Sequence, residues 1–180
     1  MKTLFVCAGV LIAAATIFAQ PGPPKSPAAT ETATIAGKAI TITYNSPRVN
    51  GRAGHIFTKD GLISKNPNYP IWRAGANSAT KLHTDADLDL GGLTVPKGDY
   101  TLYVDLSDPD NWVLIVNKQV GQWGLTYDKA QDLGRVKMSM EKPPMPMENL
   151  TYMLKGTGGS TAKLSLAWEN YCGTVKVAVK

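Results

Sequence analysis

Cysteine is nearly absent from this sequence, which contains only Cys7 and Cys172. Cys7 lies in an apolar N-terminal stretch that we expect to be removed, so the folded protein would keep one cysteine. One cysteine cannot form an internal disulfide, and neither histidine stands in a context typical of a partner for a thiol nucleophile. The fold must therefore be held together by its hydrophobic core, and a cysteine-dependent activity is not indicated.

Runs of basic residues are also lacking. The chain has 19 Lys and Arg against 14 Asp and Glu, a net charge of +5, but the basic residues are scattered and are not interleaved with aromatics. Proteins that bind nucleic acids usually concentrate basic residues on one face or along one segment. We therefore expect no nucleic acid among the partners.

The familiar motifs of catalysis and cofactor binding are missing. The glycine-rich segment 156–159 has neither the lysine nor the following helix of a phosphate-binding loop. Ser46 and Ser78, the serines nearest to the most polar loops, do not lie in the G-x-S-x-G pattern of a serine hydrolase. The sequence therefore predicts no catalytic residue and no cofactor.

Helical periodicity is absent, and short alternating segments take its place. One example is 162–168, where Ala162, Leu164, Leu166 and Trp168 alternate with more polar residues. Many short segments of this kind, separated by Gly and Pro turns, are typical of antiparallel sandwiches and barrels. We predict an all-β fold, an antiparallel β-sandwich of jelly-roll or immunoglobulin-like type, in a single domain.

The N-terminus predicts export. Lys2 precedes an apolar stretch from Leu4 to Phe18, and Ala19 offers a small residue at a cleavage point. We expect a signal peptide at 1–19, a Pro-rich disordered linker at 20–33 and the β-sandwich at 34–180. An uncleaved N-terminal anchor is the alternative. After cleavage we expect an extracytoplasmic protein, periplasmic or secreted, with no stable membrane span.

The segment 82–90 alternates strictly, which indicates a strand with one buried face. The predicted core face is Leu82, Thr84, Ala86, Leu88 and Leu90. The predicted solvent face is His83, Asp85, Asp87 and Asp89. Carboxylates in a row suit calcium, and His83 with His55 and an aspartate would suit a transition metal. The alternative is a solvated strand face whose charges discourage pairing with other molecules.

Two loops carry planar hydrogen-bond donors. Arg48 and Arg52 flank an Asn-Gly turn, and Arg73 and Asn77 lie in a second loop. Loops at the ends of a sandwich commonly carry binding sites, and arginine suits carboxylates, phosphates and sulfated sugars. Trp72 and Trp123 could add a stacking face. In the alternative interpretation Arg73 pairs with Asp99 or Glu169, Asn77 caps a turn and both tryptophans belong to the core.

Five segments in order form a recognisable set of motifs: Tyr44 to Arg52, Ile71 to Thr80, Pro96 to Leu102, Asn117 to Gly124 and Leu166 to Asn170. Together they resemble the bacterial DUF2911 family, whose function is unknown. The resemblance covers nearly all of the predicted domain and implies a secreted bacterial protein. It implies no catalytic residue, because the family has no assigned activity.

The sequence favours a non-catalytic, exported binding or interaction domain. Its predicted ligand-binding residues are Arg48, Arg52, Trp72, Arg73, Asn77 and Trp123, and an acidic glycan or another envelope component is the expected partner. One alternative is a metal-assisted hydrolase that uses His83 with Asp85, Asp87 and Asp89. Another is a purely structural envelope protein.

Overall fold

The computed structural model describes residues 25–180, so the predicted signal peptide and the first part of the predicted linker lie outside the described residues. The described part is built from β-strands and a single 3-10 turn, η1 (Lys129–Gln131), without any α-helix. No helix within it is long and apolar enough to cross a membrane. The predicted all-β class is confirmed.

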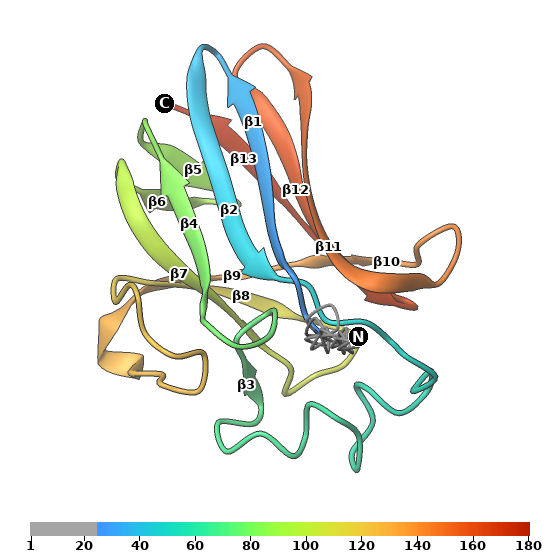
Figure 1. Cartoon of the computed structure of the whole chain (residues 1–180). Coiled ribbons are helices and arrows are strands. Elements are labelled where there is room, and N and C mark those ends of the chain that lie inside the picture. The colour runs from blue at the N-terminus through green and yellow to red at the C-terminus, as the bar shows by residue number, and fades with distance from the viewer. Residues whose placement is uncertain (1–24) are drawn as a thin grey trace, which may run out of the picture.

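The first sheet has seven strands, all paired antiparallel (Figure 1). Their order across the sheet is β1-β2-β4-β7-β8-β9, and β3 pairs with β7. The strands are β1 (Ala28–Ile35), β2 (Lys38–Asn45), β3 (Ile71–Trp72), β4 (Thr80–Thr84), β7 (Gly98–Asp105), β8 (Val113–Asn117) and β9 (Asp132–Lys137).

The second sheet has six strands, also antiparallel, in the order β11-β12-β13-β5-β6, with β10 paired to β13. They are β5 (Leu88–Leu90), β6 (Leu93–Val95), β10 (Ser139–Glu141), β11 (Met147–Gly158), β12 (Thr161–Glu169) and β13 (Tyr171–Val179). Inward-facing residues of both sheets form one core, for example Ile42 of β2, Leu102 of β7 and Leu166 of β12. The predicted antiparallel sandwich is thereby confirmed.

The alternating segment 82–90 is not one strand, as predicted, but two strands in different sheets. The chain bends after β4: the amide of Asp85 still donates to Ala39 O of the first sheet (3.0 Å). Two residues later, Asp87 O accepts from Lys180 N (2.9 Å) beside the second sheet. The predicted faces are nevertheless correct, because a strand that turns the corner of a sandwich keeps its inner face toward the core. The predicted core residues are all buried, and the predicted solvent face is exposed or half-buried.

The folded domain begins earlier than predicted. β1 starts at Ala28, within the predicted 20–33 linker, and pairs with β2 along its whole length, from Ala28 opposite Asn45 to Ile35 opposite Lys38. The sequence of β1 does not show the alternation of apolar and polar residues typical of a strand. Its side chains are small or polar, and every second residue up to Thr34 is only half-buried. Glu31 of this strand accepts a hydrogen bond from Leu154 N of β11 (2.9 Å), which joins the two sheets at that edge.

A long segment without strands, 46–70, runs around one end of the sandwich before the chain enters β3 (Figure 1). Within it, Ile56 is buried in the core, and Phe57 packs against the rings of Trp72, Trp112 and Trp168. Backbone hydrogen bonds tie the start of the segment to β11, including Val49 N to Glu148 O (2.7 Å). These contacts give the loop a fixed base beside the second sheet.

Candidate functional site

A cavity of about 540 Å³ lies at the end of the sandwich where the 46–70 segment meets the loop after β3. Five of the six predicted ligand-binding residues line it: Arg48, Arg52, Trp72, Arg73 and Asn77. The cavity also has Lys25, Asn50, Asn66 and Trp168 in its wall. Two loops that are distant in sequence therefore supply one site, as expected for loops that cluster at the end of a sandwich.

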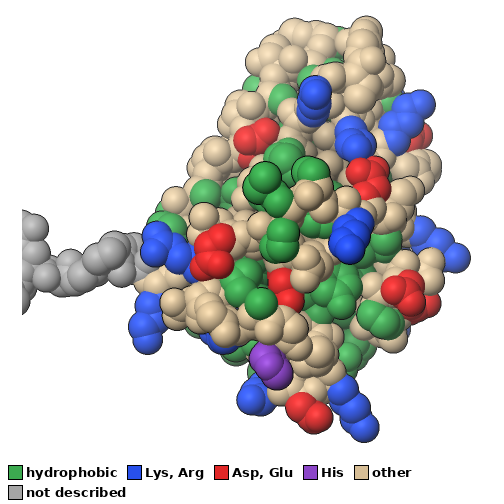
Figure 2. Space-filling view, turned by 90° about the vertical axis from the view of Figure 1, so that its right-hand side faces the viewer, with side chains coloured by type: hydrophobic (Ala, Val, Ile, Leu, Met, Phe, Trp, Pro, Cys, Tyr) green, Lys and Arg blue, Asp and Glu red, His purple; other side chains and the backbone are tan. Residues whose placement is uncertain are grey.

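The charged side chains in the wall are all basic. Within the described part of the chain, the cavity is lined by three of the four arginines and by Lys25, and by no Asp or Glu. On the face seen in Figure 2, basic and acidic side chains are interspersed, with apolar side chains between them. The cavity, by contrast, has charged side chains of one sign only in its wall.

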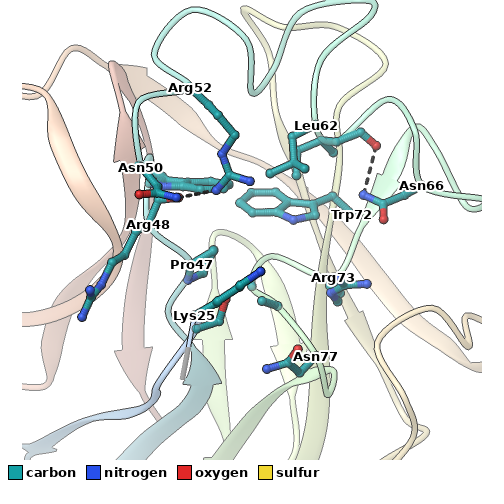
Figure 3. Close-up of a pocket in the computed structure, with 15 residues that line it drawn as sticks. Lys25, Pro47, Arg48, Asn50, Arg52, Leu62, Asn66, Trp72, Arg73 and Asn77 are labelled. Carbon is teal, nitrogen blue, oxygen red and sulfur yellow. Dashed lines mark hydrogen bonds between the residues drawn. The ribbon is translucent and has the colours of Figure 1, made fainter. Parts of the chain in front are cut away.

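The basic residues take different orientations (Figure 3). Lys25 and Arg52 extend toward the opening beside Trp72, whereas the guanidinium of Arg48 points away from it. Arg52 is held by its own loop: its Nε donates to Val49 O (3.0 Å) and its Nη2 to Arg48 O (2.6 Å). Because these acceptors are neutral carbonyls, they fix the guanidinium without compensating its charge.

Arg73 is the most unusual of these side chains. Its Nε and Nη1 are buried without a hydrogen-bond partner, and it forms no ion pair with any described residue. Burial lowers the pKa of Arg73, yet an arginine remains protonated in proteins. The stem is clamped by the loop above it, because a Cβ on Gly124 would overlap Cδ of Arg73. A half-buried cation, with two of its nitrogens buried, is held in place here without a counter-charge among the described residues.

The predicted structural partners of Arg73 are wrong. Asp99 binds Lys81 Nζ (3.2 Å) and His83 Nδ1 (2.8 Å) on the exposed side of β4 and β7. Glu169 is buried at the turn between β12 and β13 and accepts a hydrogen bond from Gly54 N. Neither carboxylate reaches the arginine, so the ion-pair explanation for Arg73 does not hold.

The two predicted tryptophans differ. Trp72 is only 1% exposed and stacks on Trp168, with ring centroids 6.1 Å apart, so its faces are covered. Its Nε1, like that of Trp168, is buried and has no hydrogen-bond partner. Trp123 is 54% exposed and lies outside the cavity lining, with Arg73 Cζ 6.0 Å from its ring centre. The core interpretation therefore holds for Trp72 and fails for Trp123.

A comparison with known families matches residues 26–177 to a family described as "Protein of unknown function (DUF2911)". The chain belongs to the DUF2911 family. The family indicated by the sequence motifs is therefore confirmed, and the match extends from just before β1 into β13. No curated protein and no solved structure matches the chain.

The second predicted site is not assembled in this DUF2911 domain. Asp87 Oδ1 accepts from Lys97 N (2.8 Å) and Asp89 Oδ1 from Gly92 N (2.8 Å), each in a local turn. His83 has a carboxylate at each ring nitrogen, Asp99 at Nδ1 and Asp85 at Nε2 (3.1 Å). Among residues 25–180, His, Cys, Asp and Glu form no group of three or more suited to a metal ion. The alternative prediction of a metal site formed by His83 and the aspartates is therefore wrong.

The same geometry predicts a measurable titration. Hydrogen bonds to Asp99 and then to Asp85 raise the pKa of His83 above its ordinary 6.5, because both stabilise the imidazolium. The matching hydrogen bond from His83, followed by that from Lys81, lowers the pKa of Asp99. Since the folded pKa of His83 is raised, its contribution to stability is complete below pH 6.5 and is lost as the pH rises through the folded pKa.

We expect an NMR titration to place the pKa of His83 above 6.5 in the wild type and to show a lower pKa in Asp99→Asn. The Asp99→Asn change removes the carboxylate and keeps the shape of the side chain. The control is Asp105→Asn, which alters an aspartate on the same strand that binds Arg135 instead (3.1 Å). A wild-type pKa at or below 6.5, or one unaffected by Asp99→Asn, would contradict the hydrogen-bonded pair.

Proposed function

We propose that this DUF2911 protein is an extracytoplasmic, non-catalytic binding domain whose ligand is an anion rich in acceptor oxygens, held in the cavity beside Arg52 and Arg73. One observation carries the proposal. Every unpaired buried polar atom of the cavity-lining side chains is an N–H donor: Nε1 of Trp72, Nε1 of Trp168, and Nε and Nη1 of Arg73. The charged lining residues are all basic as well.

Unpaired donors are costly to keep. A buried N–H without a partner costs about 1–3 kcal/mol relative to one that is hydrogen-bonded, and an unpaired charge costs more. Four such atoms in the side chains around one cavity are hard to explain by folding alone, because apolar side chains of similar shape would avoid the cost. A carboxylate, sulfate or phosphate group brings only acceptors and a negative charge, so it complements this wall.

The size and expected location restrict the ligand further. A volume of about 540 Å³ lies within the range of small-molecule sites, roughly 300–1,000 Å³. The apolar N-terminal stretch supports export, so the ligand belongs outside the cytoplasm. An acidic glycan or another anionic envelope component fits both conditions. A purely structural envelope role would gain nothing from uncompensated donors, and the alternative hydrolase site is not assembled.

Binding of matched charged and neutral sugars tests the proposal. We expect calorimetry to detect glucuronate and galacturonate but not glucose and galactose, and we expect the affinity to fall as salt is added, since an accessible charge is screened. In Arg52→Met the affinity should drop at least about tenfold, because one charge-assisted hydrogen bond is worth about 1.5–3 kcal/mol.

The matched control is Lys155→Met, which removes an exposed positive charge from β11 outside the cavity. It has the same effect on net charge and should leave the affinity within about twofold, as expected for a distant exposed charge. Equal binding of neutral and acidic sugars, or equal losses in the two variants, would contradict a specific anion site.

A further inference from the structure

Trp123 extends the site beyond the cavity. It is more than half exposed, and the guanidinium carbon of Arg73 lies 6.0 Å from its ring centre. An arginine above an indole is attracted to the ring by electrostatics, and the arrangement leaves the rest of the indole open to solvent. Arg73, which lines the cavity without a counter-charge, therefore also borders the exposed ring of Trp123.

Backbone hydrogen bonds join the loop that carries Trp123 to the loop that lines the cavity. Asn77 lines the cavity, and its carbonyl accepts from Gly124 N (3.1 Å), the residue after Trp123. Ser78, the next residue, forms a β-bridge with Trp123. Ala79 N donates to Gln122 O (3.3 Å). The loop that carries Trp123 is thus bonded directly to the loop that forms the cavity wall, and the two surfaces adjoin.

Gln122 lies outside the cavity lining, directly before Trp123 in the chain, and has an unpaired acceptor where the cavity side chains have unpaired donors. Its Oε1 is the single buried acceptor without a partner among the described side chains. Its Nε2 donates to Tyr103 Oη (3.0 Å) and to Thr101 Oγ1 (3.3 Å), which fixes the orientation of the amide. Both hydroxyls already donate to backbone carbonyls, so they must accept here. A sulfate ion has no donor for Oε1, whereas an acidic sugar carries hydroxyl donors beside its charged group.

We infer that the ligand is a polyuronate, a polysaccharide of carboxylated sugars, that occupies two adjoining subsites. One uronate residue enters the cavity, where its carboxylate meets the basic wall. The next sugar packs the aliphatic face of its ring on Trp123, and Arg73 lies between the two subsites. This assignment rests on the proposed function, because it requires the cavity to bind an anion.

Chain length is the property that separates two subsites from one. We would measure the affinity of the full domain for galacturonate and for its linear oligomers of two, three and four residues by calorimetry. The dimer should bind about tenfold more tightly than the monomer, since an aromatic contact with its buried area is worth roughly that factor. Further residues should add little.

Two variants assign that gain to Trp123. Trp123→Ala should bind the monomer as the wild type does and lose the tenfold gain of the dimer. Val120→Ala should keep the gain. This change shortens another apolar side chain of the same loop, which is 47% exposed. A thermal melt of each variant establishes that the loop change has not altered folding, as expected for exposed side chains.

The outcomes distinguish the inference from the proposed function. If the monomer binds and chain length has no effect, or if Trp123→Ala keeps the gain, the second subsite is refuted and the anion site stands. If fully methyl-esterified oligomers bind as well as the acids, or sulfated oligosaccharides bind more tightly with the same length dependence, the carboxylate assignment is refuted. If no acid binds at any length, both the inference and the proposed function fail.

Discussion

Leu88→Asp is expected to leave little folded protein at room temperature. Leu88 is 1% exposed on β5, where it pairs with Val95 of β6 and Val179 of β13. The change removes a buried apolar side chain, a loss of about 2–5 kcal/mol, and places a carboxylate where it has no partner, which costs several more. Together these approach the typical stability of a domain, about 5–15 kcal/mol.

Urea unfolding followed by circular dichroism measures this effect. Asp85→Ala is the matched control, because Asp85 lies three residues away on the exposed side and contacts His83 only at the surface. Its stability should remain within about 0.5 kcal/mol of the wild type. Asp87 is a poorer control, since its carboxylate accepts from Lys97 N. Similar losses in Leu88→Asp and Asp85→Ala would contradict the assignment of faces.

The fold could be predicted to the extent that its signals are local. Alternation assigns a face to each residue from its immediate neighbours, so the buried set from Leu82 to Leu90 was correct. The division of that segment between two sheets could not be foreseen. It depends on hydrogen bonds to Ala39 and Lys180, which lie far away in the sequence. β1 could not be foreseen either, because its small side chains give no local signal and the segment becomes a strand only by pairing with β2.

The site was predictable in position and less so in detail. Loops at one end of a sandwich meet, which explains why Arg52 and Arg73 line one cavity. Side-chain direction depends on tertiary packing, so the outward turn of Arg48 had no signal in the sequence, and the sequence left open whether Trp72 is buried or exposed. Trp168 was missed as a cavity residue because its place in an alternating strand is that of an ordinary core residue.

Replacement by methionine should have opposite effects on stability at Arg135 and at Arg73. Arg135 donates to Asp132 Oδ2 (3.0 Å), to Asp105 Oδ2 (3.1 Å) and to the hydroxyl of Tyr127 (2.8 Å). Arg135→Met would leave Asp105 Oδ2 without a partner and would remove the counter-charge of Asp132, which is only 10% exposed and would keep the hydrogen bond from the Tyr127 hydroxyl (2.8 Å). We expect a loss of about 2 kcal/mol, or a melting temperature lower by roughly 4–8 °C in a domain of this size.

Arg73→Met should behave differently, since no acceptor among the described residues loses a partner. Methionine keeps the apolar stem beneath Gly124 and removes the unpaired buried donors, so the melting temperature should stay the same or rise by about 2–4 °C, the equivalent of roughly 1 kcal/mol. Binding of galacturonate should fall more than about tenfold, because the half-buried guanidinium supplies charge-assisted hydrogen bonds to the anion.

A thermal melt with and without galacturonate measures both effects in one experiment, because a ligand that binds only the folded state raises the melting temperature. The wild type should show this rise, and Arg73→Met should start at an equal or higher temperature without it. A variant that melts as early as Arg135→Met would make Arg73 a structural residue. In a binding site, Arg73 can weaken the fold and still strengthen binding. Its buried donors have no acceptor in the free protein and find one only when the anion is present.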